Sequence, residues 1–93
     1  MSVTVRIPGI WRGLSGGQAE IQVEGATVTE ALKHLGEQYP RLRDRLFTPE
    51  GELKSYVHIF VNQIDIKTLS GAETSLSEHD EIILLMAIAG GAV

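Results

Sequence analysis

The segment TVTEALKHLGEQY, residues 27–39, decides the fold of this chain. Thr27 is a natural N-cap, and Glu30 three residues later completes the pattern of a capping box. Pro40 disfavours helical backbone at the residue before it and predicts that the helix ends at Tyr39. Apolar residues recur at the spacing of one helical face: Val28, Ala31, Leu32, Leu35 and Tyr39. The segment is therefore predicted to be an amphipathic helix that covers one face of a sheet.

Two alternating segments precede this helix. Residues 2–8 (SVTVRIP) and 19–24 (AEIQVE) place an apolar side chain at every second position, which is the period of a half-buried strand. The glycine-rich stretch GIWRGLSGG, residues 9–17, lies between them, and Trp11 within it is expected to anchor the loop. We expect the two strands to form an antiparallel hairpin with a long connection.

A short helical turn and a tight turn are expected after Pro40. Residues 41–47 (RLRDRLF) can turn three apolar side chains inward: Leu42, Leu46 and Phe47. Residues 48–51 (TPEG) fit a type I turn, with proline at its second position and glycine at its fourth. Arg41 and Arg45 share a helical face, but Asp44 dilutes their charge, so we expect solvated arginines and keep an anion site as the alternative.

The last third of the chain contains two strong strand signals. Residues 56–61 (YVHIFV) form the first, followed by a turn at Asn62-Gln63 and a short return strand over 64–67. Residues 68–80 are polar and predict an irregular connection. Residues 81–87 (EIILLMA) are apolar almost throughout, which is typical of a central strand.

The order of these elements predicts an α+β fold of the β-grasp, or ubiquitin-like, type. We expect a mixed sheet of four to five strands with one principal helix across one face, and the last strand beside the first. The domain is predicted to span residues 1–87, and residues 88–93 to form a flexible C-terminal tail.

Composition narrows the possible functions. The chain has 93 residues, which is one domain, and no cysteine, so disulfides, thiolate metal sites and cysteine nucleophiles are excluded. A net charge of −4 argues against nucleic acid as the main partner. The three histidines lack metal-ligand spacing, and no apolar run is long enough to span a membrane. We expect a cytoplasmic protein without metal or cofactor.

Several segments resemble the ubiquitin-like sulfur carrier proteins. This family includes the thiamine-pathway carrier, the small subunit of molybdopterin synthase and the carrier that supplies a dedicated cysteine synthase. The similar segments are VTVRIPGIWR and GGQAEI near the start, TVTEALKHL in the helix, YVHIFVN in the third strand and LSEHDEIILLMAIAGG at the end. The opening and the GGQ loop look most like the cysteine-synthase carrier. Family members commonly have glycine where His79 stands, and histidine tolerates the left-handed backbone of such a turn better than most residues.

The resemblance implies the chemistry of the tail. In the family, an ATP-dependent enzyme adenylates the C-terminal glycine, which then becomes a thiocarboxylate whose sulfur an accepting synthase takes. Here that glycine is Gly91, and the small residues Gly90 and Ala89 give the tail access to a narrow active site. Ala92 and Val93 extend beyond the family's mature end. We expect a zinc metallopeptidase to remove them.

A docking surface is expected on the last two long strands. Alternation puts Ile82, Leu84 and Met86 on one face of the last strand and the residues between them on the other. By analogy with ubiquitin-like partners, the predicted patch is Phe60, Ile83 and Leu85 with His58 beside it. His58 is expected to be a surface residue rather than an acid or base, because no spacing suggests a catalytic partner. Four acidic residues near this face are expected to be ordinary surface charges: Asp65, Glu78, Asp80 and Glu81.

The sequence thus favours a carrier rather than an enzyme, and several alternatives stay open. Within the family, the runner-up to sulfur transfer for cysteine or a related metabolite is the molybdopterin synthase small subunit. Outside it, the chain could be a non-reactive ubiquitin-like module that binds partners through its sheet. Conjugation to proteins through an isopeptide bond would use the same activated Gly91.

Overall fold

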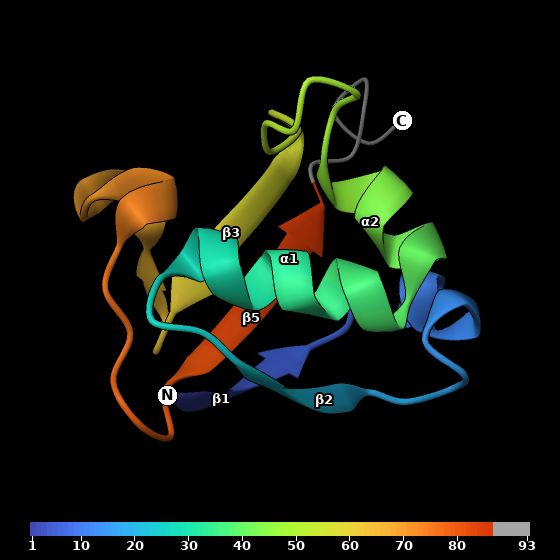
Figure 1. Ribbon diagram of the computed structural model, residues 1–93, viewed down its shortest axis with the longest axis horizontal. Helices are drawn as coiled ribbons and strands as arrows, with labels where there is room; N and C mark the ends of the chain where they lie inside the picture. Colours follow the sequence, from blue (N-terminus) through green and yellow to red (C-terminus); the bar gives the residue numbers. More distant parts are fainter. Residues whose placement is uncertain (87–93) are drawn as a thin grey trace.

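A five-stranded mixed sheet carries two helices on one face (Figure 1). The computed structural model describes residues 1–86. The strands, in their order across the sheet, are β2 (Glu20–Glu24), β1 (Ser2–Arg6), β5 (Glu81–Met86), β3 (Val57–Val61) and β4 (Ile64–Asp65). The helices are α1 (Val28–Gln38) and α2 (Pro40–Leu46), and three short 3₁₀ helices are η1 (Gly9–Leu14), η2 (Ile66–Thr68) and η3 (Gly71–Glu73).

The pairing of the strands confirms the predicted β-grasp fold. β1 and β2 form an antiparallel hairpin in which Ser2 pairs with Glu24. β5 lies at the centre of the sheet, parallel to β1 and antiparallel to β3. The last strand therefore runs beside the first, as its apolar composition indicated.

Helix α1 begins where the sequence predicted. The Thr27 hydroxyl accepts a hydrogen bond from the Glu30 N–H at 3.2 Å, and the Glu30 carboxylate accepts one from the Ala26 N–H at 2.9 Å. The first bond satisfies a donor that the first turn of a helix otherwise leaves unpaired, and the second holds the residue just before the cap. Tyr39 is the C-cap, and Pro40 starts the next helix at once, because proline suits the first helical position.

The segment after Pro40 forms a complete short helix rather than a turn. α2 buries Leu42 and Leu46 on the core side, and Phe47 follows them inward. The arginine positions Arg41 and Arg45 are exposed, as expected. The fold therefore has one principal helix and a second, seven-residue helix packed against it.

The predicted glycine-rich connection at 9–17 is more regular than the sequence indicated. Its first six residues form η1, and Trp11 is only 4% exposed, so it anchors this segment to the core. The Ser15 side chain is fully buried and donates to the Gln18 carbonyl at 2.8 Å. Ala19, predicted to point inward with the second strand, is instead exposed because β2 begins one residue later.

The connection between β3 and β5 also contains more structure than predicted. Asn62 and Gln63 both have positive φ, 50° and 74°, which is typical of a type I′ hairpin turn. The return strand β4 has only two residues, because the Asp65 carboxylate accepts from the Lys67 N–H and starts η2. His79 adopts a φ of 70° in the turn before β5, so the left-handed conformation expected there is present.

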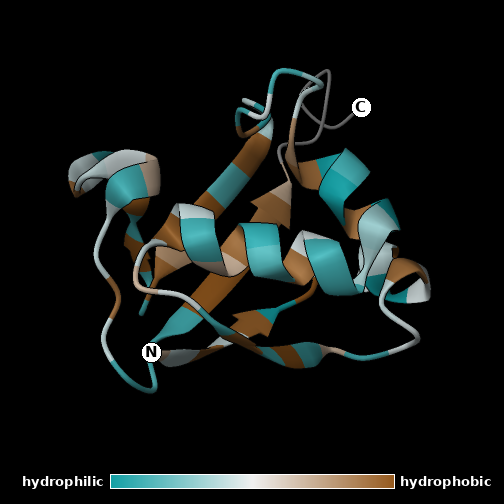
Figure 2. Ribbon diagram, in the orientation of Figure 1, coloured by the Kyte–Doolittle hydropathy of each residue, from teal (hydrophilic) through white to brown (hydrophobic). Residues whose placement is uncertain are grey.

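The core lies between the sheet and the helices. Inward side chains of the four longer strands meet the apolar stripe of α1, whose outward side is polar (Figure 2). Among residues 1–86, no helix is long and apolar enough to cross a membrane. Ala87 and the tail 88–93 lie outside the described residues.

Candidate functional site

The central strand β5 carries the chain to its C-terminal segment. Its last residue, Met86, pairs with Val57 at the start of β3. The chain therefore leaves the sheet at the end where α2 and the segment before β3 lie (Figure 1). The predicted reactive and processing residues all lie outside the described residues: Ala89, Gly90, Gly91, Ala92 and Val93.

The four predicted docking residues come together on the sheet face opposite the helices. His58 pairs with Leu85, and Phe60 pairs with Ile83, so the four side chains form two neighbouring cross-strand pairs. The alternate residues of both strands are buried in the core: Ile59, Val61, Ile82 and Leu84. Leu85 is 49% exposed, and the other three patch residues are half-buried.

A charged cluster lies beside this apolar patch. The Arg6 guanidinium is 3.5 Å from the Glu20 carboxylate and 3.1 Å from the Glu81 carboxylate, so it joins strands β2, β1 and β5. All three side chains are at least partly exposed, which limits the contribution of these ion pairs to stability. The open face is thus apolar over β5 and β3 and charged where β1 meets β2.

The acidic residues near this face have roles within the fold. The Asp80 carboxylate accepts from the Ser77 N–H at 2.8 Å and from the Asn62 amide at 2.9 Å. Asn62 in turn accepts from the Glu81 N–H at 3.0 Å, which ties the β3–β4 turn to the start of β5. The Glu78 carboxylate accepts from the Ser2 N–H. These contacts hold the start of β5 in register.

Tyr56 is an exposed residue near the site that the sequence reasoning missed. It is 39% exposed and directly precedes Val57, the partner of Met86. The Lys54 ammonium lies 5.8 Å from the centre of its ring. The signal was present in the sequence, since Tyr56 continues the alternate row of His58 and Phe60.

The exposed surface of this site suits contact with another protein. Its exposed members are mainly apolar, and His58 pairs with a leucine across the strands instead of a potential catalytic partner. Within residues 1–86, no cluster of three or more histidine, aspartate or glutamate side chains is placed to hold a metal ion.

Comparison with known proteins agrees with this architecture. The ThiS family model matches residues 5–91 of the chain. The sulfur carrier protein CysO of Mycobacterium tuberculosis is 36% identical over 93 residues, which cover 98% of this chain and all of that protein.

Solved structures extend the likeness. CysO in the BexX/CysO complex of Amycolatopsis orientalis superposes with a TM-score of 0.86 at 32% identity, covering 96% of this chain and 99% of that chain. The small archaeal modifier protein 1 of Methanosarcina acetivorans superposes with a TM-score of 0.87 at 30% identity. The match covers 97% of this chain and 96% of that chain. On its sequence, its fold and these relatives, the chain belongs to the ThiS family of ubiquitin-like sulfur carrier proteins.

Proposed function

We propose that the chain carries sulfur as a thiocarboxylate on Gly91 and delivers it for the synthesis of cysteine or a related sulfur metabolite. The protein acts as a co-substrate of other enzymes and performs no catalysis itself. Because ATP is the energy source, the proposal places this reaction in the cytoplasm.

The proposed chemistry has two steps at one carboxyl group. A carboxylate is a poor electrophile, so an adenylating enzyme first joins it to the AMP part of ATP and releases pyrophosphate. A sulfide sulfur then attacks the acyl carbon, the bond to AMP breaks, and the thiocarboxylate remains. The small side chains of Ala89 and Gly90 let the tail enter a narrow active site.

The extent of the family match is the observation that carries this proposal. The match ends at Gly91 and leaves out the following Ala92 and Val93. Two extra residues move a carboxylate about 7 Å along an extended chain, far beyond the tolerance of a reacting centre. We therefore propose that a peptidase, of the zinc metallopeptidase type that the family resemblance suggests, cleaves after Gly91.

The apolar patch on β3 and β5 is proposed as the docking surface for the adenylating enzyme and the sulfur-accepting synthase. Its support is geometric: Phe60, Ile83, Leu85 and His58 lie on one face, next to the strand that leads into the tail. The relative from Amycolatopsis orientalis was solved in a complex with BexX, which supports partner binding by a domain of this shape.

Conjugation to other proteins is the second candidate function. A relative 30% identical to this chain is a small archaeal modifier protein, which favours this alternative specifically. It would use the same adenylated Gly91 but transfer the acyl group to a lysine amine instead of to sulfur. A molybdopterin synthase subunit would differ only in the accepting enzyme, and a non-reactive binding module would need no free diglycine.

The intact mass of the protein from its native cells tests these functions. Loss of Ala92 and Val93 together with replacement of one oxygen by sulfur is the expected result. A chain ending at Gly91 with a normal carboxylate, together with larger adducts, would favour conjugation. An unchanged mass during active sulfur metabolism would reject the carrier function and favour the binding module.

A further inference from the structure

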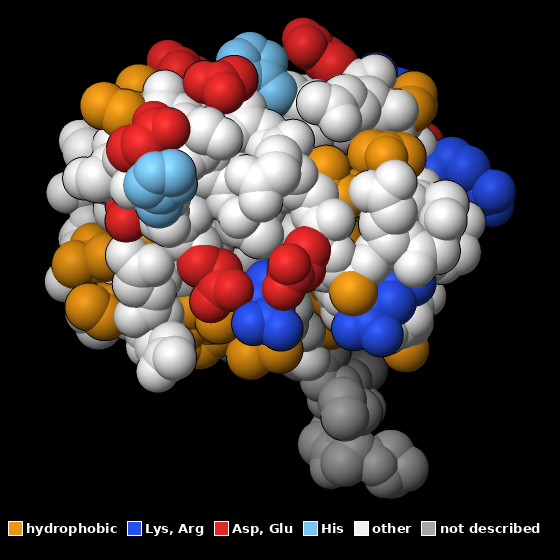
Figure 3. All heavy atoms as spheres, turned by 90° about the horizontal axis from the view of Figure 1, so that it is seen from below, with side chains coloured by type: hydrophobic (Ala, Val, Ile, Leu, Met, Phe, Trp, Pro, Cys, Tyr) orange, Lys and Arg blue, Asp and Glu red, His pale blue; other side chains and the backbone are white. Residues whose placement is uncertain are grey.

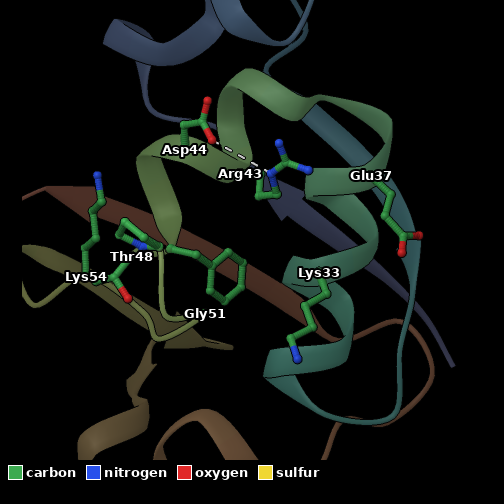
Figure 4. Close-up of a pocket in the computed structure, with 9 residues that line it drawn as sticks. Lys33, Glu37, Arg43, Asp44, Thr48, Gly51 and Lys54 are labelled. Carbon is green, nitrogen blue, oxygen red and sulfur yellow. Dashed lines mark ion pairs between the residues drawn. The ribbon is translucent and has the colours of Figure 1, made fainter.

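A large hollow lies on the helical side of the molecule, away from the open sheet face. It has a volume of about 700 Å³, within the range of small-ligand sites, and lies between α1, α2 and the segment that follows α2 (Figure 4). Phe47, only 9% exposed, contributes an aromatic ring to its wall. Thr48, Pro49 and Gly51 line it from the loop that follows α2.

Three basic side chains from three different segments line this hollow. Lys33 comes from α1, Arg43 from α2 and Lys54 from the segment before β3 (Figure 4). Arg43 pairs only with its exposed neighbour Asp44, at 3.8 Å, and neither lysine forms an ion pair with any residue in the described part of the chain. Lys33 and Lys54 therefore present charges that no ion pair neutralises in the described part of the chain, whereas Arg43 is paired with Asp44, which also lines the hollow.

These residues belong to the end of an acidic molecule that carries a slight excess of basic residues. Six of the eight lysines and arginines lie on η1, α1, α2 and the segment up to residue 54, together with five acidic residues. The rest of the chain has two basic and seven acidic residues. Figure 3 shows the same separation on the face it presents, where most basic side chains gather at the end that bears η1 and α2.

The hollow lies close to the point where the chain leaves β5. The Lys54 N–H donates to the Leu46 carbonyl at 2.9 Å, and the Val57 N–H donates to the Lys54 carbonyl at 3.2 Å. Val57 is the cross-strand partner of Met86. A protein that handles the tail can therefore reach this hollow while holding the residues that follow Met86.

We infer that this hollow is a second docking site, which takes an acidic segment of a partner protein bearing an aromatic or apolar residue between its carboxylates. The basic side chains attract the carboxylates of the segment, and the Phe47 ring packs against its apolar residue. Glu37 and Asp44 also line the hollow and oppose an acidic ligand, so they limit affinity. The assignment of the partner as a protein of the sulfur-transfer cycle rests on the proposed function.

A peptide titration tests the site directly. The full chain, labelled with nitrogen-15, is titrated with the peptide acetyl-Glu-Glu-Phe-Glu-Glu-amide and followed by amide chemical shifts. We expect shifts at Lys33, Arg43, Gly51 and Lys54 that weaken with added salt. The same peptide with glutamine in place of glutamate should cause little change.

Charge variants separate this site from general electrostatic attraction. Lys33→Glu and Lys54→Glu should each weaken binding about two- to fivefold, and Glu37→Gln should strengthen it by a similar factor. Lys67→Glu makes the same charge change at the other end of the molecule and should have little effect. Strengthening by Glu37→Gln is informative because a variant that merely damaged the fold could not produce it.

Several results would overturn the inference. They are an absence of shifts, shifts confined to β3 and β5, equal binding of the glutamine peptide, or equal weakening by Lys67→Glu. Inorganic phosphate that produced the same shifts at similar concentration would show a small-anion site and reject the protein partner. The titration does not involve Gly91, so its failure leaves the carrier function standing, and a failed carrier function leaves the peptide site standing.

Discussion

Gly36 sets how closely α1 and α2 approach each other. A Cβ atom at this position would lie 2.8 Å from the Arg43 Cβ and 3.1 Å from its Cγ, closer than packed carbon atoms allow. Glycine within a helix costs about 1 kcal/mol relative to alanine, so the close packing offsets an intrinsic loss of stability. The same contact holds the stem of Arg43 at the edge of the basic hollow.

Gly36→Ala is therefore expected to lower the free energy of unfolding by about 1 kcal/mol, despite the better helix propensity of alanine. Urea denaturation of the full chain measures this change. Gly13→Ala is the matched control, since an added Cβ there meets nothing within 4 Å. A Gly36→Ala variant as stable as the wild type would show that α2 moves aside without cost.

Leu85 is the most exposed member of the proposed sheet patch, so it tests docking without disturbing the core. Leu85→Asp should reduce binding to the adenylating enzyme about tenfold or more, because a carboxylate would replace an exposed apolar contact of the patch. The measurement is ATP–pyrophosphate exchange as a function of carrier concentration, with circular dichroism to confirm folding.

Leu69→Asp provides the control for this experiment. Leu69 is 45% exposed, close to the value for Leu85, but it follows η2 and lies outside the patch. Equal losses in the two variants would point to charge or stability instead of docking. Unchanged exchange with a folded Leu85→Asp variant would remove this residue from the interface.

At the scale of the element, the start of α1 depends on local hydrogen bonds. Thr27→Ala removes the acceptor for the Glu30 N–H and should destabilise the protein by about 1 kcal/mol. Thr27→Ser keeps an acceptor in the same place and should recover most of the loss. Thermal unfolding of the three proteins under the same conditions measures the difference, and equal midpoints would mean that water replaces the cap.

These local signals explain why α1 could be predicted with its ends. The N-cap, the apolar stripe and Pro40 all lie within the helix or next to it, so their meaning does not depend on the rest of the fold. The 3₁₀ helix η1 could not be predicted in the same way, because Trp11 is drawn inward by the core rather than by its neighbours in sequence. The predicted return strand over 64–67 is likewise shorter than expected, because Asp65 ends β4 and caps η2.

At the scale of the whole molecule, the sheet patch was predictable and the basic hollow was not. The pairing of Phe60 with Ile83 follows from the period of two strands whose neighbourhood the sequence already indicated. The hollow requires Lys33, Arg43 and Lys54 to meet from three segments, and nothing in their spacing indicates this. The arginines of α2 considered alone predicted only a solvated face.

The position of the terminal carboxylate is a property of the whole chain and the most direct test of the proposed chemistry. Removal of Ala92 and Val93 moves the terminal carboxylate to Gly91. ATP–pyrophosphate exchange should rise by about 10²-fold or more, because a misplacement of even ~1 Å costs that much.

A chain that ends at Gly90 is the matched control, since it also has a glycine carboxylate but presents it one residue short. It should support little exchange if the adenylating enzyme measures the length of the tail from the sheet patch. Equal exchange by all three chains would mean that the enzyme accepts tails of different length. Removal of Ala92 and Val93 would then not be needed for adenylation. No exchange by the chain ending at Gly91 would reject adenylation at this glycine, and the apolar patch would then be left as the site of a protein that only binds.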